Sequence, residues 1–262
     1  MRKEKKGIFA SVYIVGLLAF LYIPILIMIA YSFNSSEISS IWGGFSTEWY
    51  KVLFSRHDVR NALLNTLEVS VPATVISIVL ATVGVIGFYK YDFKGKKIID
   101  SILYLPAVVP PLLLGIALLS LYNILGIKLG TMTIIIAHIT FCTPFAFTTI
   151  KGAMDGFDRS LEEAARDLGC GEFETILKVI VPNIMPGIIS AALITFTISL
   201  DDVLTSFFVA GAGKNTLSMF IYSCLKKGVK PDINALSTIL IVVSVALGVA
   251  SQLIGRKEER DQ

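Results

Sequence analysis

The sequence has few charged residues for its length. Only 16% of its 262 residues are charged, whereas 54% are hydrophobic, and the mean hydropathy is +0.74. A soluble domain needs a more polar surface than this, so the composition excludes that class and indicates an integral membrane protein. The net charge of +3 is small. It is better explained by charged loops than by a basic surface for nucleic acid, and no nucleic-acid partner is expected.

Cysteine and histidine are also scarce. The three cysteines, Cys142, Cys170 and Cys224, are an odd number, and two of them lie in or beside hydrophobic runs. They do not suggest a disulfide framework. The two histidines, His57 and His138, are far apart, and no zinc-binding spacing is present. We therefore expect no metal site, and we expect structural roles for the histidines.

Sequence motifs of catalysis and nucleotide binding are missing. There is no Gly-x-Ser-x-Gly elbow, no His-Glu-x-x-His pair and no Gly-x-x-x-x-Gly-Lys-Ser/Thr loop. The chain is therefore predicted not to be an enzyme and to bind no cofactor of its own. If ATP drives its function, ATP and Mg must bind to a different polypeptide.

Long hydrophobic runs, in contrast, dominate the chain. Each is long enough to cross about 30 Å of hydrocarbon as a helix. The first follows a basic head and lacks a small-residue cleavage site, so it is predicted to be retained rather than removed as a signal peptide. Prolines at 106, 110 and 111 interrupt the third, and neighbouring groups must satisfy the carbonyls they free. The sequence predicts an all-α integral membrane protein, a single domain over residues 1–262, with six transmembrane helices at about 8–31, 67–89, 101–122, 131–150, 184–209 and 235–254.

The loops between these runs differ in positive charge. The amino terminus, residues 90–97, residues 151–178 and the carboxyl tail hold most of the lysines and arginines. The positive-inside rule then predicts that both termini are cytoplasmic. Four lysines of the last external loop oppose this assignment, namely Lys214, Lys226, Lys227 and Lys230.

A polar loop, residues 159–182, lies between the fourth and fifth predicted spans. Ser160 and Glu163 have the spacing of a capping box, which predicts that a helix begins at Ser160. Gly169 is suited to end it in a left-handed conformation. Residues three and four apart form a small apolar face, consisting of Leu161, Ala164, Ala165 and Leu168.

The other face of this short helix is polar. Glu162, Arg166 and Asp167 are expected to point away from the apolar face. About two helical turns are not stable alone in water, so something must hold the helix. Composition alone favours a surface helix that lies along its own domain.

The same loop resembles the EAA loop of ABC-importer permeases, in which Glu-Ala-Ala, three residues, Gly, nine residues and Ile-x-Leu-Pro follow in order. The matching residues are Glu163-Ala164-Ala165, Gly169 and Val179-x-Val181-Pro182, with Val at both the Ile and the Leu positions. The resemblance implies a type I ABC-importer permease fold and a cytoplasmic coupling helix that docks into a cleft of a separate ATPase. The residues implied in this coupling are Leu161, Glu162, Glu163, Ala164, Ala165, Leu168 and Gly169.

Two acids, Asp201 and Asp202, lie inside the fifth hydrophobic run. A carboxylate at the bilayer centre costs about 2.5–3.5 kcal/mol, so it usually faces protein or water and marks a pathway. Adjacent helical residues point about 100° apart, which predicts two stripes rather than one shared small site. One stripe holds Thr195, Ser199, Asp202 and Ser206, and the other holds Thr197, Asp201 and Thr205.

An acidic face on an apolar helix suits a cation that passes along a pore. The residues predicted to line a substrate pathway are Asp201, Asp202, Ser199, Thr205, Ser206 and, from the second span, Glu68. Two structural explanations stay open: the acids are buried and tied to neighbouring helices, or the helix is shorter than predicted. Glu68 could equally lie at headgroup level.

Further stretches extend the resemblance along the whole chain, among them Tyr22-Ile-Pro-Ile25, Ser32-Phe-Asn-Ser-Ser36 and Ser199-Leu-Asp-Asp-Val203. They resemble the permease subunits of bacterial spermidine/putrescine ABC importers. This implies a heterodimer with a second permease, two ATPase subunits and an extracytoplasmic polyamine-binding protein, in the lipid bilayer of the bacterial inner membrane. The alternatives are a permease for another cationic or neutral solute, a proton-coupled secondary transporter and, disfavoured by the adjacency of the acids, an intramembrane protease.

Overall fold

A computed structural model describes the backbone of residues 2–37, 41–227 and 231–261, and the side chains of residues 13–37, 41–226 and 231–254. The basic side chains of the amino-terminal head and of the carboxyl tail, together with Lys227 and Lys230, lie outside the described residues. In the described part of the chain, the β-type pairing is limited to one bridge, between Asn34 and Phe45. The predicted all-α class is therefore confirmed.

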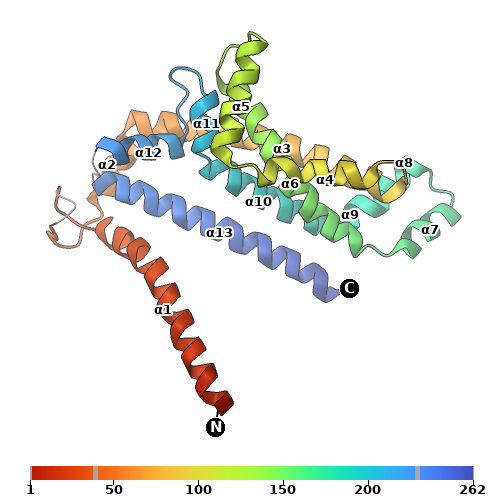
Figure 1. The fold of residues 1–262 in the computed structure, drawn as a ribbon, viewed down its shortest axis with the longest axis horizontal. Helices are drawn as coiled ribbons and strands as arrows, with labels where there is room; N and C mark the ends of the chain where they lie inside the picture. Colours follow the sequence, from red (N-terminus) through yellow and green to blue (C-terminus); the bar gives the residue numbers. More distant parts are fainter. Residues whose placement is uncertain (1, 38–40, 228–230, 262) are drawn as a thin grey trace. The chain divides into compact units, whose positions relative to one another are not determined.

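Helices follow one another along the chain (Figure 1). They are α1 (Arg2–Tyr31), α2 (Glu48–Ser55), α3 (His57–Lys90), α4 (Lys96–Val108), α5 (Pro111–Ile124), α6 (Thr131–Asp155), α7 (Arg159–Asp167), α8 (Glu172–Thr175), the π-helical turn η1 (Ile176–Ile180), α9 (Val181–Asn183), α10 (Met185–Asp201), α11 (Leu204–Val209), α12 (Leu217–Lys227) and α13 (Pro231–Asp261). Four of the described helices are long and apolar enough to cross a membrane, and up to six spans result if each bent pair is one span.

Both bent pairs lie near prolines. Helices α4 and α5 meet at 103°. Val109 and Pro110 between them are extended, because a residue that precedes proline is disfavoured in the α conformation. The span expected at 101–122 is thus divided into two helices. The run from α8 to α9 meets α10 at 67°, close to Pro186 in the first turn of α10.

The fifth expected span, 184–209, is also interrupted. Helix α10 ends at Asp201, Asp202 is extended with φ −66° and ψ 127°, and a new helix, α11, begins at Leu204. The open possibility of a shorter helix is therefore realised. The break lies at the acidic pair itself, so the two carboxylates stand at a helix end rather than along a continuous helix.

The chain divides into two units, residues 1–60 with 221–242, and residues 61–220 with 243–262. In the first unit, the buried Asn34 organises the loop after α1. Its Nδ2 donates to the Ile41 carbonyl at 2.7 Å, and its Oδ1 accepts the Gly43 N–H at 2.7 Å. Trp49 Nε1 donates to the Asn34 carbonyl at 2.7 Å, so the loop is attached to α2.

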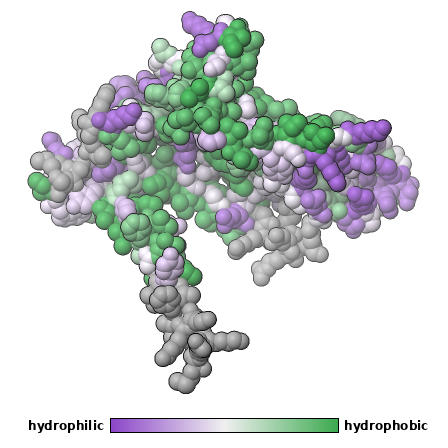
Figure 2. Space-filling model, viewed as in Figure 1, coloured by the Kyte–Doolittle hydropathy of each residue, from purple (hydrophilic) through white to green (hydrophobic). Residues whose placement is uncertain are grey.

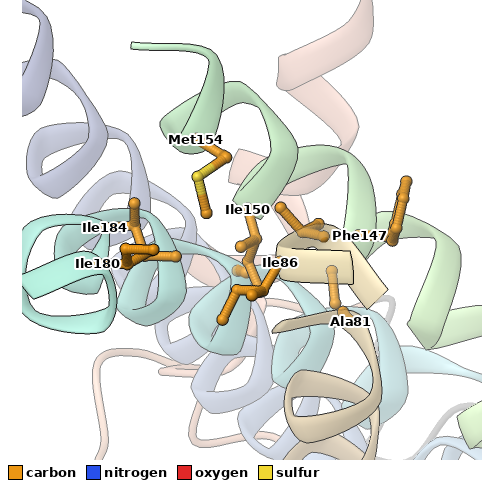
Figure 3. Packing of buried hydrophobic residues seen from close by; sticks show 10 residues of the cluster. Ala81, Ile86, Phe147, Ile150, Met154, Ile180 and Ile184 are labelled. Carbon is orange, nitrogen blue, oxygen red and sulfur yellow. The ribbon is translucent and has the colours of Figure 1, made fainter. Parts of the chain in front are cut away.

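The second unit is held by a core of buried apolar side chains at one end of α3 and α6. Figure 3 shows Phe147, Ile150 and Met154 of α6 gathered with Ile180 and Ile184 from the segment before α10. Ala81 and Ile86 of α3 complete the labelled set. This core fixes the segment that follows α7 onto the membrane-spanning helices.

Close backbone approach joins α5 and α11 in the same unit. A Cβ on Gly115 would lie 3.0 Å from Phe208 Cδ2 and 3.2 Å from Thr205 Cα. A Cβ on Gly211 would lie 2.3 Å from the Leu129 carbonyl oxygen. Only glycine fits at position 211, and a Cβ at position 115 would require its neighbours to shift, so the end of α11 lies directly against the connection that leads into α6.

Candidate functional site

Helix α7 has its N-cap two residues earlier than the sequence predicts. Asp158 is the N-cap, and its Oδ1 accepts the backbone N–H of Ser160 at 2.9 Å. This N–H holds the pKa of the Asp158 carboxyl below its usual value. The predicted capping box of Ser160 and Glu163 is therefore wrong, because a carboxylate two residues earlier takes the N-cap position and also suits the positive end of the helix.

The carboxyl end of α7 confirms the role of Gly169. Its φ is +87°, in the left-handed region. The Gly169 N–H donates to the Arg166 carbonyl at 2.9 Å, and the Cys170 N–H donates to the Ala165 carbonyl at 3.0 Å. This pair of bonds is the Schellman arrangement, in which a glycine reverses the chain and satisfies the last carbonyls.

The inner face of α7 is polar. Glu162 is only 9% exposed, and its carboxylate accepts Tyr89 Oη–H at 2.9 Å and Arg166 Nη2–H at 2.8 Å. Lys90 Nζ lies 3.4 Å from it. The prediction that Glu162 faces away is wrong, because the end of α3 supplies the hydroxyl and the ammonium that make its burial possible.

The predicted apolar face is therefore divided. Ala165 is buried against the chain, whereas Leu161, Ala164 and Leu168 are exposed, Leu168 to 86%. Glu163 is exposed beside them. Hydrophilic residues gather over α7, α8 and the neighbouring end of α4 in Figure 2. The three apolar side chains thus lie within a polar region and stay exposed in the part of the chain that the structure describes.

Two separate contacts attach the segment after α7 to the membrane-spanning helices. Glu172 Oε1 lies 3.3 Å from Lys90 Nζ, which holds the pKa of the Glu172 carboxyl below its usual value. Farther on, Ile180 is fully buried between the half-buried Val179 and Val181 of the resemblance motif. Lys90 therefore holds both Glu162 and Glu172, and the apolar part of the motif belongs to the core.

A cavity of about 510 Å³ lies where the break between α4 and α5 meets the break between α10 and α11. Its apolar wall includes Phe141 and Phe145 of α6 and Pro106 of α4. Its acidic residues are Asp201 and Asp202. The sequence predicted separate stripes for these acids. The helix ends between them and both residues border the same cavity, but their carboxylates have different partners, so the two acids do not share one small site.

The two carboxylates have different partners. Asp201 is exposed, and both of its oxygens lie 3.2–3.3 Å from Ser244 Oγ, which donates to them. Asp202 has a side chain only 9% exposed. Its Oδ2 accepts the N–H and the Oγ–H of Ser206, each at 2.8 Å. Asp202 therefore caps α11, while Asp201 keeps accepting capacity toward the cavity.

His138 of α6 connects the halves of the broken helix, which confirms the structural role expected for it, although the sequence did not indicate its partners. The ring is fully buried, with Nδ1 2.7 Å from Ser199 Oγ of α10 and Nε2 2.8 Å from Ser206 Oγ of α11. Nε2 also lies 3.6 Å from Asp202 Oδ2. A polar ring inside an apolar run was the available signal, but its partners are 61 and 68 residues away.

Of the other residues predicted for the pathway, Glu68 lies away from the cavity and Thr205 borders it. Glu68 of α3 is half-exposed and lies 3.5 Å from Lys214 Nζ, and it does not border this cavity. Thr205 does border the cavity, but its side chain is buried, with Oγ1 3.4 Å from the Pro111 carbonyl. Of the predicted pathway residues, the structure thus brings together Asp201, Asp202, Ser199, Thr205 and Ser206, and leaves Glu68 apart.

Comparisons with known proteins agree with the expected resemblance. The chain is 38% identical to the spermidine/putrescine transport system permease protein PotC of Escherichia coli (strain K12) over 248 residues, which cover 95% of this chain and 94% of the relative. It is 35% identical to the putrescine transport system permease protein PotI of the same strain, over 92% of this chain and 89% of the relative.

Solved structures show the same fold at low sequence identity. A bacterial ABC transporter involved in the import of the acidic polysaccharide alginate aligns with a TM-score of 0.70 at 18% identity, over 97% of this chain and 96% of that one. The MetNI methionine ABC transporter in an inward-facing conformation aligns with a TM-score of 0.62 at 19% identity, over 82% and 99%. The predicted ABC-importer permease fold is therefore confirmed.

Residues 73–260 match the family described as Binding-protein-dependent transport system inner membrane component. This match covers most of the chain, and the PotC relative extends the similarity over nearly all of it. The chain therefore belongs to the family of binding-protein-dependent transport system inner membrane components, the membrane-embedded permease subunits of ABC importers.

Proposed function

We propose that this chain is the permease subunit of an ATP-driven importer of polyamines such as spermidine and putrescine, and that it forms half of the translocation pathway. The observation that carries the proposal is the 38% identity to PotC over 95% of the chain, together with the name of that relative. The chain itself performs no catalysis. It binds no cofactor of its own, and a partner subunit binds ATP and Mg.

The acidic cavity supports a cationic cargo. A polyamine is a slender polycation with methylene segments between its ammonium groups. Asp201 is exposed and has a hydroxyl as its partner, so its carboxylate can accept an ammonium group. Phe141 and Phe145 on the same cavity supply faces for the methylene segments and for cation–π contact. Asp201 is therefore the residue that we assign to cargo contact, with Asp202 holding the break in place.

Helix α7 is suited to receive the motion of an ATPase. Leu161, Ala164 and Leu168 are exposed on one side of it, and Glu163 lies beside them. We assign this side to the cleft of the ATPase, with Gly169 ending the docking helix. On the other side, Glu162 connects α7 to the end of α3 through Tyr89 and Lys90. A movement of α7 is thereby passed to the membrane-spanning helices.

Transport then follows alternating access. ATP closes the ATPase dimer, α7 moves with its cleft, and the permeases open outward; hydrolysis reverses the change. A ligand can drive this cycle only if it binds the two conformations of the transporter with different affinities. Helix α7 must therefore remain bound in the ATPase cleft in both conformations. The assembly comprises this chain, a second permease, two ATPase subunits and an extracytoplasmic polyamine-binding protein. It lies in the bacterial inner membrane, with both termini of this chain in the cytoplasm by the positive-inside rule.

The test is uptake of radiolabelled spermidine into vesicles that contain the reconstituted complex. We expect uptake that requires ATP, that putrescine competes with and that a nonhydrolysable nucleotide does not support. Uptake that is driven by a proton gradient without an ATPase partner would instead identify a secondary transporter. ATP-dependent uptake of another solute with no effect of spermidine would keep the importer and overturn the polyamine assignment.

A further inference from the structure

A second cavity, of about 370 Å³, lies at the end of α6 from which the chain leads into α7. Its charged lining comes from three helices, with Lys96, Lys97 and Asp100 on α4, Lys151 and Asp155 on α6, and Arg159 on α7. Four of these six groups are cationic. Neither the acidic cavity nor the contacts between α7 and α3 account for this concentration of positive charge.

The charges of this cavity are only partly neutralised. Lys151 Nζ lies 2.9 Å from both carboxylate oxygens of Asp100, so this pair is satisfied internally. Among the groups that line the cavity, Lys96, Lys97 and Arg159 then remain with one carboxylate, that of Asp155, while Asp92 outside the cavity lies 3.9 Å from Lys96 Nζ. An excess of positive charge in a recess with low-dielectric walls attracts an anion.

The free donors are placed to bind such an anion. Arg159 lies over the Tyr89 ring at 5.3 Å, a contact that leaves the in-plane N–H groups of its guanidinium available. Lys96 Nζ donates to the Tyr91 carbonyl at 3.1 Å and lies 3.9 Å from the almost fully exposed Asp92. An ammonium has three donors, so these contacts leave Lys96 able to bind a further acceptor.

The N-terminus of α4 adds to the positive electrostatic potential of this cavity. Its N-cap is Gly95, with no side-chain cap, and its first turn holds no acidic residue but two lysines. Cations at the positive end of a helix are unfavourable, whereas an anion there is stabilising. A bound anion would relieve an arrangement of Lys96 and Lys97 that otherwise costs stability.

We propose that this cavity binds a phosphate group, carried either by the headgroup of an anionic phospholipid or by inorganic phosphate. Arginine and lysine from different helices are the groups that bind phosphate in such recesses. The cavity also has an apolar side, which includes Phe88.

The test uses the full chain, purified in detergent with its partner subunits, and native mass spectrometry. Retention of phosphatidylglycerol is compared with that of zwitterionic phosphatidylcholine and with binding of inorganic phosphate. The double variant K96Q/K97Q removes the two lysines that α4 contributes to the cavity. The control is Lys94→Gln, which replaces one exposed lysine in the turn that precedes α4, outside the cavity.

We expect the wild-type chain to retain phosphatidylglycerol at least about tenfold more tightly than phosphatidylcholine, a preference that K96Q/K97Q removes and that Lys94→Gln preserves. If inorganic phosphate displaces the lipid, and binds with the same dependence on these lysines, the site is assigned to free phosphate. If it does neither, the site is assigned to the lipid. Equal retention of both lipids by the wild-type chain, or equal behaviour of K96Q/K97Q and wild type toward phosphatidylglycerol and phosphate, would overturn the proposal. None of these readouts depends on polyamine uptake.

Discussion

Asp201 and Asp202 are neighbours in sequence, but their carboxylates have different partners. Ser244 donates to Asp201, which remains exposed, whereas Ser206 donates twice to Asp202 at the start of α11. The first arrangement leaves the Asp201 carboxylate accessible to the cargo that we propose. The second satisfies the helix end, and it makes Asp202 part of the framework of the cavity.

Variants of the two aspartates should therefore differ in kind. Asp201→Asn should lower spermidine uptake about tenfold, equivalent to about 1.4 kcal/mol, with an unchanged melting temperature. Asp202→Ala removes the acceptor of the Ser206 N–H, so it should lower uptake and also reduce stability by about 1 kcal/mol, as loss of a helix cap does. Uptake and thermal unfolding of the purified complex measure both effects. Unchanged uptake in both variants would return the pair to a structural role.

Loss of His138 should reduce the stability of the folded protein. His138→Ala removes a buried ring and leaves the hydroxyls of Ser199 and Ser206 without a partner from α6, which should cost about 3 kcal/mol of stability. The matched control is His57→Ala at an exposed position, which should change stability by less than about 0.5 kcal/mol. Equal melting temperatures for the two variants would contradict the role assigned to His138.

At the scale of elements, the reversal after α7 depends on one glycine. Gly169 has a φ of +87° with open space around it, so a β-branched side chain there is opposed by backbone strain alone, about 1–2 kcal/mol. Gly169→Val should unwind the end of α7 and abolish ATP-driven uptake, while the membrane-spanning helices stay folded. Gly171→Val, at a nearby glycine with a φ of −69° and open space, is the control and should keep uptake. Equal uptake by both would refute the coupling role of α7.

The amino end of α7 should respond to pH through Asp158. Its folded pKa lies below the unfolded value, so its stabilising effect is present above about pH 4 and is lost as the pH falls through the folded pKa. Hydrogen exchange of the α7 amides, corrected for intrinsic rates, should show less protection near pH 3 than near pH 7. Asp158→Ala should lower protection at neutral pH and remove this dependence. A variant with wild-type pH dependence would show that another group is responsible.

The sequence predicts the class of each element better than its ends and partners. Hydrophobic runs and prolines indicate the spans and their interruptions, and Gly169 indicates the end of α7. The periodicity that predicted separate stripes for Asp201 and Asp202 assumes an unbroken helix. The break between them and the burial of Glu162 depend on contacts with His138 and Lys90, which come from distant parts of the chain and leave no local pattern.

At the scale of the whole molecule, the positive-inside rule makes a topological prediction that the external lysines oppose. In a background without the three native cysteines, Lys214→Cys should react only with a thiol reagent applied from outside the cell. Lys94→Cys, in the loop between α3 and α4, should react only after permeabilisation. Labelling of Lys214→Cys from the cytoplasmic side would invert the topology, and α7 would then lie on the wrong side for a cytoplasmic ATPase.

The two helix breaks at the acidic cavity affect its electrostatic potential. Helices α4 and α10 end there, so each directs the negative pole of its dipole toward the cavity. The opposing positive poles are weakened, because proline at the first position of α5 lacks an N–H and Asp202 occupies the N–H groups of α11. The backbone of α4 and α10 thus adds negative potential at the cavity, provided that Asp202 continues to occupy the N–H groups of α11. Preference for positive charge at this cavity is therefore a property of the fold as well as of Asp201, and replacing Asp201 alone would weaken that preference without reversing it.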